Sequence, residues 1–297
     1  MPSRRVISTI IPTYNRRELV REAVASVLAQ NDPGEECEIL VVDDGSTDGT
    51  DSDLARVAPG IKYLRQDHSG VSAARNLGIL QSRGDIIAFL DSDDLWLPGK
   101  LAAQLAFFRE NPSAVLCQTE ETWLRRGKKL NPKKYHKKPE GRCFPLLLER
   151  CLVSPSAVAM RRGLFDSVGL FDESLPACED YDLWLRIGSR YPLGLIEKPL
   201  VIKRGGHPDQ LSATIPSLDR FRIRALAKLL CTGTLEQADH DAARKVLLEK
   251  ARVYAGGCRK RGKEAEAELM EDLVRGILNV DHLPDSSPLF LSEFLLK

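Results

Sequence analysis

Short apolar runs alternate with amphipathic stretches along the first hundred residues of the chain. The runs at residues 6–11, 38–42 and 86–90 are short and predominantly apolar, as buried strands are. Residues 17–30 and 71–81, which lie between them, carry apolar side chains at helical spacing. Strands that alternate with helices predict an α/β fold with a mixed, mostly parallel sheet and helices on both of its faces.

The second half of the chain changes from this alternation to a helical pattern. Residues 156–160 and 193–201 resemble further strands, but beyond residue 216 the sequence is rich in Ala, Leu, Glu, Lys and Arg. We therefore expect one α/β domain over residues 1–212 and a helical C-terminal extension over residues 213–297.

Composition places the chain among ordinary globular proteins. With 297 residues, 43% of them hydrophobic and 29% charged, it is long enough for one large domain with an appendage. A net charge of +1 gives no overall bias toward nucleic acid as a partner. The seven cysteines include no Cys-x-x-Cys pair and their number is odd, which argues against a zinc site or a disulfide framework.

Membrane-directed segments are not evident in the sequence. The first residues lack the apolar core of a signal peptide, and no stretch approaches the ~20 apolar residues that a spanning helix needs. The apolar stretch at residues 289–296 is more typical of a segment that docks on the protein than of an anchor. We expect a cytoplasmic protein. Peripheral contact with the inner face of a membrane and the oligomeric state both stay open.

One segment of the chain is strongly basic, although the net charge of the chain is only +1. Eight cations gather within residues 122–142, namely Arg125, Arg126, Lys128, Lys129, Lys133, Lys134, Lys137 and Lys138. Such runs usually form a solvated loop or hairpin. The alternative is a surface that receives an anionic acceptor, such as a phospholipid-linked one.

The most informative polar feature is an acidic cluster at the end of a predicted strand. Residues 89–94 read Phe-Leu-Asp-Ser-Asp-Asp, so Asp91 and Asp93 flank Ser92. Carboxylates this close repel one another and are costly to desolvate, which favours a cation between them. Oxygen ligands of this kind suit Mg²⁺ or Mn²⁺, which commonly bind a substrate phosphate as well.

Two other polar segments also follow predicted strands. Pro12, Thr13 and Tyr14 end the first strand, and Asp43 and Asp44 end the second. Ligands of parallel sheets gather at the carboxyl ends of the strands. We therefore expect both segments to meet the acidic cluster in space.

Four segments carry a family resemblance when they are taken together and in order. They are the lead-in at residues 10–16, the Val-Val-Asp-Asp-Gly-Ser segment within residues 39–50, the Gly-Val-Ser-Ala-Ala-Arg-Asn segment within residues 70–78 and the Cys-Glu-Asp-Tyr-Asp segment within residues 177–186. Together with the acidic cluster, they resemble the inverting glycosyltransferases of family 2, which use nucleotide-activated sugars on the GT-A fold. The resemblance spans roughly residues 5–210.

The resemblance implies a nucleotide-sugar site at the strand ends. Tyr14, after Pro12 and Thr13, would stack on the nucleobase, although it could also be a core aromatic. Asp44 would accept a hydrogen bond from a uracil imide, unless it only caps the turn before Ser46.

Two further features bear on this nucleotide site. Arg75 would reach the diphosphate, the alternative being a plain surface arginine. His68 and Ser69 stand where many relatives carry a Glu-Asn pair, which leaves the contacts of that loop open.

The resemblance also implies a metal site. Asp93 would ligate Mn²⁺ or Mg²⁺ directly, and Asp91, beside Ser92, would meet the ribose hydroxyls or a metal-bound water. Asp94 would cap the helix expected after Pro98 or be exposed. His207 would complete the metal shell or touch the diphosphate, unless it is a solvated loop histidine.

The catalytic base implied by the resemblance is Asp180, the Asp of the Glu-Asp pair, with Glu179 as the competing candidate. The expected reaction is inverting transfer of a sugar from a nucleotide donor, for which we expect UDP, to the hydroxyl of a glycan or lipid-linked acceptor. One alternative is a nucleotidyltransferase, although the first strand lacks its Gly-rich basic phosphate loop. The other is a nucleotide-sugar sensor or inactive scaffold.

Overall fold

One nine-stranded sheet organises the described part of the chain. The structure is a computed structural model, and it describes residues 6–30, 35–130, 137–207, 210 and 214–279. The order of strands is β3-β2-β1-β4-β8-β6-β9-β5, with β7 paired to β6. The bounds are β1 Val6–Thr13, β2 Glu36–Asp43, β3 Lys62–Arg65, β4 Ile86–Phe89, β5 Leu95–Trp96, β6 Leu116–Arg125, β7 Lys128–Leu130, β8 Val158–Arg161 and β9 Gly194–Gly205.

The N-terminal half of this sheet is parallel, as the sequence predicts. β1 pairs in parallel with both β2 and β4, and β2 pairs in parallel with β3. The register places Thr13 opposite Asp43, while the backbone N–H of Leu90 donates to the carbonyl of Ile10. The polar segments after β1, β2 and β4 therefore leave the sheet at one edge, which confirms that they meet.

The C-terminal half of the sheet is mixed. β8 runs antiparallel to β4 and β6, whereas β6 and β9 are parallel to each other over a bulged register. The sequence does not predict β6, because its second part, Glu-Glu-Thr-Trp-Leu-Arg, is only partly buried and its apolar and polar residues do not alternate regularly. β6 and β7 form a hairpin, so the hairpin interpretation of the basic segment is correct for its described part.

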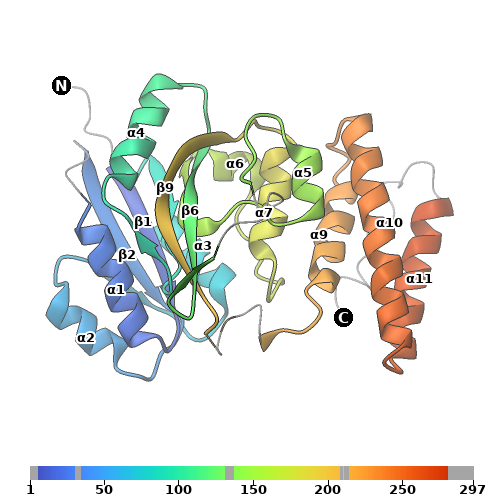
Figure 1. Cartoon of the computed structure of the whole chain (residues 1–297), viewed down its shortest axis with the longest axis horizontal. Coiled ribbons are helices and arrows are strands. Elements are labelled where there is room, and N and C mark those ends of the chain that lie inside the picture. The colour runs from blue at the N-terminus through green and yellow to red at the C-terminus, as the bar shows by residue number, and fades with distance from the viewer. Residues whose placement is uncertain (1–5, 31–34, 131–136, 208–209, 211–213, 280–297) are drawn as a thin grey trace.

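Helices cover both faces of the sheet (Figure 1). Successive residues of β1 point to opposite sides, so Ile11 packs in one core cluster and Ile10 in the other. The first cluster receives side chains from α1, α2 and α4, and the second from α3, α5, α6 and α7. Their bounds are α1 Arg17–Leu28, α2 Thr50–Val57, α3 Val71–Gln81, α4 Lys100–Glu110, α5 Phe144–Glu149, α6 Leu164–Val168 and α7 Glu179–Gly188.

The C-terminal helices lie at the end of the molecule farthest from α1 and α2 (Figure 1). They are α9 Asp219–Cys231, α10 Gln237–Arg259 and α11 Glu264–Asn279. Apolar side chains of all three join the core cluster of α7. Lys228 of α9 adds ion pairs to Asp172, at 2.6 Å, and to Asp182, at 2.7 Å. The expected domain boundary at residue 212 and the stretch 289–296 lie outside the described residues.

In the part of the chain that the structure describes, we find no helix with the length and apolar character needed to cross a bilayer.

Candidate active site

Two adjoining cavities open at the edge of the sheet where β1, β2 and β4 end. The first, of about 450 Å³, is lined by the acidic cluster and by Glu179 and Asp180; we call it the carboxylate cavity. The second, of about 760 Å³, is lined by Tyr14, Asp44 and His68; we call it the ring cavity. The two cavities share Pro12, Arg16, Val71 and Ser92 as lining residues. An elongated ligand could therefore occupy both.

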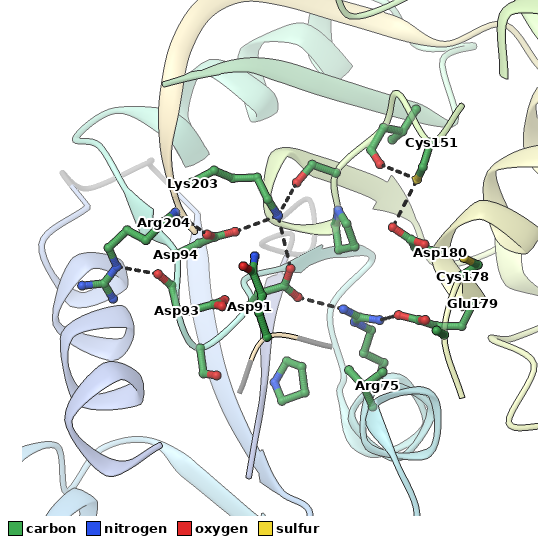
Figure 2. A pocket seen from close by; sticks show the side chains of 18 of the residues that line it. Arg75, Asp91, Asp93, Asp94, Cys151, Cys178, Glu179, Asp180, Lys203 and Arg204 are labelled. Carbon is green, nitrogen blue, oxygen red and sulfur yellow. Dashed lines mark hydrogen bonds and ion pairs between the residues drawn. The ribbon is translucent and has the colours of Figure 1, made fainter. Parts of the chain in front are cut away.

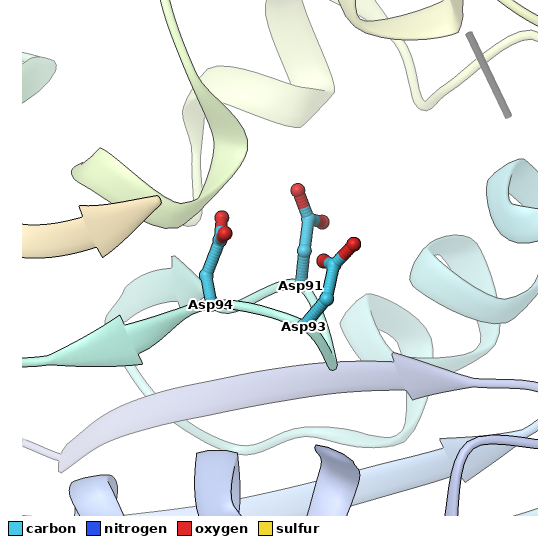
Figure 3. A group of neighbouring side chains, drawn as sticks. All are labelled: Asp91, Asp93 and Asp94. Carbon is cyan, nitrogen blue, oxygen red and sulfur yellow. The ribbon is translucent and has the colours of Figure 1, made fainter. Parts of the chain in front are cut away.

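The acidic cluster forms the floor of the carboxylate cavity (Figure 3). Oxygens of Asp91, Asp93 and Asp94 lie within 4.8 Å of one another. Ser156, which leads into β8, fixes the turn that carries them. Its hydroxyl donates to Asp94 at 2.6 Å and accepts the backbone N–H of Asp91 at 3.1 Å. The cluster is thus held by the segment that precedes β8, which is distant in sequence.

Each carboxylate of the cluster has a cationic neighbour, and Figure 2 shows those of Asp91 and Asp94. Arg16 lies 3.2 Å from Asp93. Arg75 donates to Asp91 at 2.8 Å, and Lys203 of β9 lies 3.1 Å from Asp94 and 3.6 Å from Asp91. These cations reduce the repulsion between the three acids, so the cluster can persist before any ligand binds.

The pKa values of Asp91 and Asp94 are shifted in opposite directions. Burial opposes ionisation of Asp91, but the charges of Arg75 and Lys203 outweigh it and lower the pKa of Asp91 to about 2. Burial dominates at Asp94 and raises its pKa to about 7, although Lys203 opposes the rise. Asp94 is completely buried and α4 has no side-chain cap, so the expectations that Asp94 is exposed or caps that helix are both wrong. It is an internal partner of Ser156 and Lys203.

A divalent cation fits this cluster chemically. Mg²⁺ and Mn²⁺ prefer oxygen ligands, and the three carboxylates offer one oxygen each within a small volume. Asp93 is 8% exposed and lines the cavity, so a cation held there could also contact a ligand. His207 belongs neither to this group nor to the residues that line the two cavities.

Arg75 connects the acidic cluster to the opposite wall of the carboxylate cavity. Besides Asp91, its guanidinium donates to Glu179, the first residue of α7, at 2.6 Å. The side chain is almost completely buried, which rules out the plain surface arginine. Its two carboxylate partners outweigh the effect of burial and raise the pKa of Arg75 further. Burial raises the pKa of Glu179, although Arg75 opposes that rise.

Asp180 lies next to Glu179 but is partly exposed in the cavity (Figure 2). The thiol of Cys151 donates to one carboxylate oxygen at 3.2 Å, and the backbone N–H of Tyr181 donates to the other at 2.7 Å. Burial and the charge of Asp180 raise the pKa of Cys151 well above its usual value, so the sulfur stays a protonated donor. Nothing in the sequence signals this contact, because Cys151 belongs to no motif.

Two stacked rings line the ring cavity. The ring centroids of Tyr14 and His68 are 4.0 Å apart, with an angle of 23° between the planes. Tyr14 is 42% exposed, so it is not a core aromatic. Together the rings offer a flat surface of the kind on which a nucleobase stacks.

Asp44 has more partners than the sequence predicts. Its carboxylate accepts the backbone N–H groups of Ser69 and Gly70, at 2.8 and 2.9 Å. It also accepts Gln66 Nε2 at 2.7 Å and lies 2.8 Å from His68 Nδ1. Three hydrogen bonds to its carboxylate, with a contact of His68 Nδ1 to its backbone carbonyl at 3.1 Å, show that Asp44 anchors the loop at residues 66–70. Asp43 caps the turn, since it accepts the N–H of Ser46 at 2.7 Å.

Comparison with known proteins finds a matching protein family. A family model described as "Glycosyl transferase family 2" matches residues 8–169. The chain is 38% identical over 197 residues to an uncharacterized glycosyltransferase of Rickettsia conorii, which covers 65% of this chain and 32% of that protein. It thus spans about a third of the length of the first curated relatives it matches.

A relative with a more specific name comes from Escherichia coli. UDP-Glc:alpha-D-GlcNAc-diphosphoundecaprenol beta-1,3-glucosyltransferase WfgD is 31% identical over 187 residues, which cover 61% of this chain and 69% of WfgD.

Solved structures agree in fold. S. aureus TarS 1-349 in complex with UDP-GlcNAc has a TM-score of 0.67 at 22% identity, and the match covers 83% of this chain and 71% of that TarS fragment. Mannosyltransferase PcManGT from Pyrobaculum calidifontis, in complex with GDP-Man and Mn²⁺, has a TM-score of 0.59 at 19% identity, with coverage of 99% and 86%. At these identities the likeness concerns the fold, and it confirms the expected GT-A architecture with a helical C-terminal region.

Proposed function

Because this chain belongs to glycosyl transferase family 2, we propose that it transfers a sugar from a uridine diphosphate donor to an acceptor hydroxyl with inversion at the anomeric carbon. The observation that carries the proposal is the shared cavity. Asp180 and the acidic cluster line the same 450 Å³ space, although they come from distant parts of the sequence. Inverting transfer needs a base and a leaving-group site on opposite sides of one sugar.

The donor would span both cavities. Its base would stack on Tyr14 and His68, while the diphosphate would extend past Pro12 and Ser92 toward the acidic cluster. Uridine is supported by the name of one fold neighbour, which was solved with UDP-GlcNAc. Since the Asp44 carboxylate already accepts three hydrogen bonds, its neighbours Gln66 and His68 are the side chains that would form a hydrogen bond with the base.

Asp93 would hold Mn²⁺ or Mg²⁺ together with Asp91, which is held in position by Arg75. When bound, the cation supplies Lewis-acid stabilisation of the departing diphosphate. Arg16 and Lys203 line the same cavity and add positive charge on the leaving-group side. The approach of His207 to a bound diphosphate stays a prediction.

Asp180 is a better candidate for the base than Glu179. Glu179 is 6% exposed and bound to Arg75, so its carboxylate has a structural partner that it would have to leave. Asp180 faces the cavity, and within the described residues its hydrogen-bonded side-chain partner is the thiol of Cys151. In the proposed step its carboxylate removes the acceptor proton, the acceptor oxygen bonds to the anomeric carbon and the bond to the diphosphate breaks on the opposite face.

The acceptor would be a glycan carried by a lipid diphosphate. This part of the proposal is supported by the name of WfgD, whose acceptor is a diphosphoundecaprenol-linked sugar. A cytoplasmic protein in contact with the inner face of a membrane would meet both substrates.

Release of UDP tests the proposed function. Purified protein is incubated with a panel of UDP-sugars and Mn²⁺, with and without a lipid-diphosphate-linked sugar, and free UDP is measured. We expect release that depends on Mn²⁺ and increases with acceptor. Binding of UDP-sugars without any release, across acceptors, would instead support the sensor or scaffold. The nucleotidyltransferase alternative loses its support, because the family assignment is to glycosyltransferases.

A further inference from the structure

The hairpin of β6 and β7 has a tight turn that fixes its register. Arg126 and Gly127 connect the strands, and both have positive φ, 51° and 75°. Two such residues in succession are typical of a type I′ turn, whose twist matches that of the strands. The pairing is therefore well defined, with Trp123 opposite Leu130 and Arg125 opposite Lys128.

This register gathers two apolar and two cationic side chains on one side of the hairpin. Side chains alternate along a strand, so residues 123 and 125 point the same way, as do their partners 130 and 128. We call these four residues, Trp123, Arg125, Lys128 and Leu130, the hairpin face. Leu124 and Lys129 pair with each other on the opposite side.

The hairpin face is exposed and its charges are uncompensated. Trp123 is 39% and Leu130 is 41% exposed. Within the described residues, neither Arg125 nor Lys128 has an ion-pair partner. The nearby acid, Glu121, is paired with the buried Lys138 at 3.1 Å and accepts the indole N–H of Trp123 at 2.9 Å. An anionic surface would thus meet cations here.

The hairpin face continues the wall of the carboxylate cavity. Trp123 lines that cavity and is in register with Lys203 of β9, whose ammonium lies 6.0 Å from the centre of the indole ring. A molecule that leaves the cavity past Trp123 next meets Arg125 and Lys128.

We propose that the hairpin face docks on a bilayer rich in anionic phospholipids, with Trp123 and Leu130 at the level of the headgroups and Arg125 and Lys128 on lipid phosphates. Indole rings favour the membrane interface, and basic side chains beside them are attracted to anionic lipids. Resting on the proposed function, this orientation would direct the cavity mouth to a lipid-linked acceptor. A soluble polyanion such as nucleic acid is less suited, because its bases could stack on Trp123 but it offers no apolar phase to Leu130.

Vesicle binding tests the proposal without any turnover. The protein is sedimented with vesicles of equal parts phosphatidylglycerol and phosphatidylcholine, and with pure phosphatidylcholine. We expect binding to the anionic vesicles only, weakened by salt. Equal binding to both vesicle types, or to neither, would overturn the proposal. Tighter binding to single-stranded DNA than to anionic vesicles would do so as well.

Tryptophan fluorescence reports which surface touches the lipid. Of the three tryptophans, Trp96 and Trp184 are buried and Trp123 is exposed. Brominated phosphatidylglycerol should therefore quench the emission of the wild-type protein, and Trp123→Phe should lose the quenching while it still sediments. Binding without quenching would place the contact elsewhere.

Matched variants separate the hairpin face from charge in general. Arg125→Gln with Lys128→Gln removes two cations from the face, and should weaken binding roughly 10- to 30-fold. Arg126→Asn with Lys129→Gln removes two cations from the turn and the opposite side, and should weaken it clearly less. Equal losses would contradict an oriented face. UDP release with a detergent-soluble acceptor should be unchanged in both pairs, so a failure of membrane binding is distinct from a failure of the transferase proposal.

Discussion

The carboxylate cavity and the ring cavity adjoin, yet they are built differently. In the carboxylate cavity, acids and cations from distant elements neutralise one another: Arg75 of α3 binds Asp91 after β4 and Glu179 of α7, and Lys203 of β9 binds Asp94. In the ring cavity, Asp44 holds the loop at residues 66–70 mainly through hydrogen bonds from uncharged donors, two of them backbone N–H groups, and the rings stay exposed.

This difference predicts which property a substitution in each cavity would change. A buried charge whose partner is removed is costly, so changes in the carboxylate cavity should affect both folding and activity. The ring cavity is a surface feature, and changes there should alter ligand affinity with little effect on folding.

The largest expected effect is on turnover, at Asp180. Asp180→Asn should lower the rate of UDP release about 10²- to 10⁴-fold, as removal of a positioned base does, while UDP still binds. Asp166 of α6 is a matched control, because both aspartates lie in the first turn of a helix. Asp166 is exposed and lines neither cavity. Asp166→Asn should keep wild-type rates. Near wild-type turnover in Asp180→Asn would remove Asp180 from the mechanism.

The next effect is on stability, at Arg75. Arg75→Met leaves Asp91 and the buried Glu179 without their shared cation and should lower the free energy of unfolding by about 3–5 kcal/mol. Arg83→Met, which breaks exposed pairs with Glu36 and Glu38, should cost less than about 1 kcal/mol. Urea denaturation of the three proteins measures both values. Similar small losses would mean that Arg75 does not hold the two walls together.

The ring cavity should respond in affinity alone. His68→Ala removes one of the two stacked rings and a partner of Asp44, and should weaken UDP binding roughly 5- to 10-fold, within the range of a base–aromatic contact. The urea midpoint should change little, because His68 is largely exposed. A large loss of stability with unchanged affinity would reverse the roles assigned to the two cavities.

A smaller effect is expected at Cys151, which acts through Asp180. Cys151→Val keeps the approximate volume but removes the S–H donor, and should lower turnover roughly fivefold, the size of one modest hydrogen bond. Cys151→Ser, which can still donate, should recover most of the rate. If serine and valine behave alike, the thiol only fills space.

The smallest effect concerns pH and the C-terminal helices. Partial burial opposes ionisation of Asp172, but hydrogen bonds from Lys228 and Ser174 lower its pKa to about 2. A carboxyl group whose pKa is lower in the folded than in the unfolded state stabilises the fold at pH values above its unfolded pKa, near 4. That stabilisation is lost as the pH falls toward 2. Lys228→Met should therefore cost about 1 kcal/mol at pH 7, because the buried Asp182 keeps Arg186 as its partner, and less at pH 2–3, as measured by denaturant unfolding. An equal cost at both pH values would contradict this.

The sequence predicted the elements of the site better than their contacts. The strand ends with Asp44 and Asp91 were predictable because apolar runs stop there and parallel strands share an edge. The ion-pair partners of Arg75 and Lys203 were not predictable, since they lie on other elements and only the packed chain brings them together. Asp94 was misjudged for the same reason: a carboxylate after a strand gives no sign that Ser156 and Lys203 will enclose it.

The central claim is that the acidic cluster holds a divalent cation to which the donor diphosphate binds. Calorimetric titration of UDP, with Mn²⁺ and with a chelator in its place, tests it most directly. We predict binding that weakens at least tenfold in the chelator, and a similar loss in Asp93→Asn with Mn²⁺ present. An unchanged dissociation constant for UDP under all three conditions would contradict the claim.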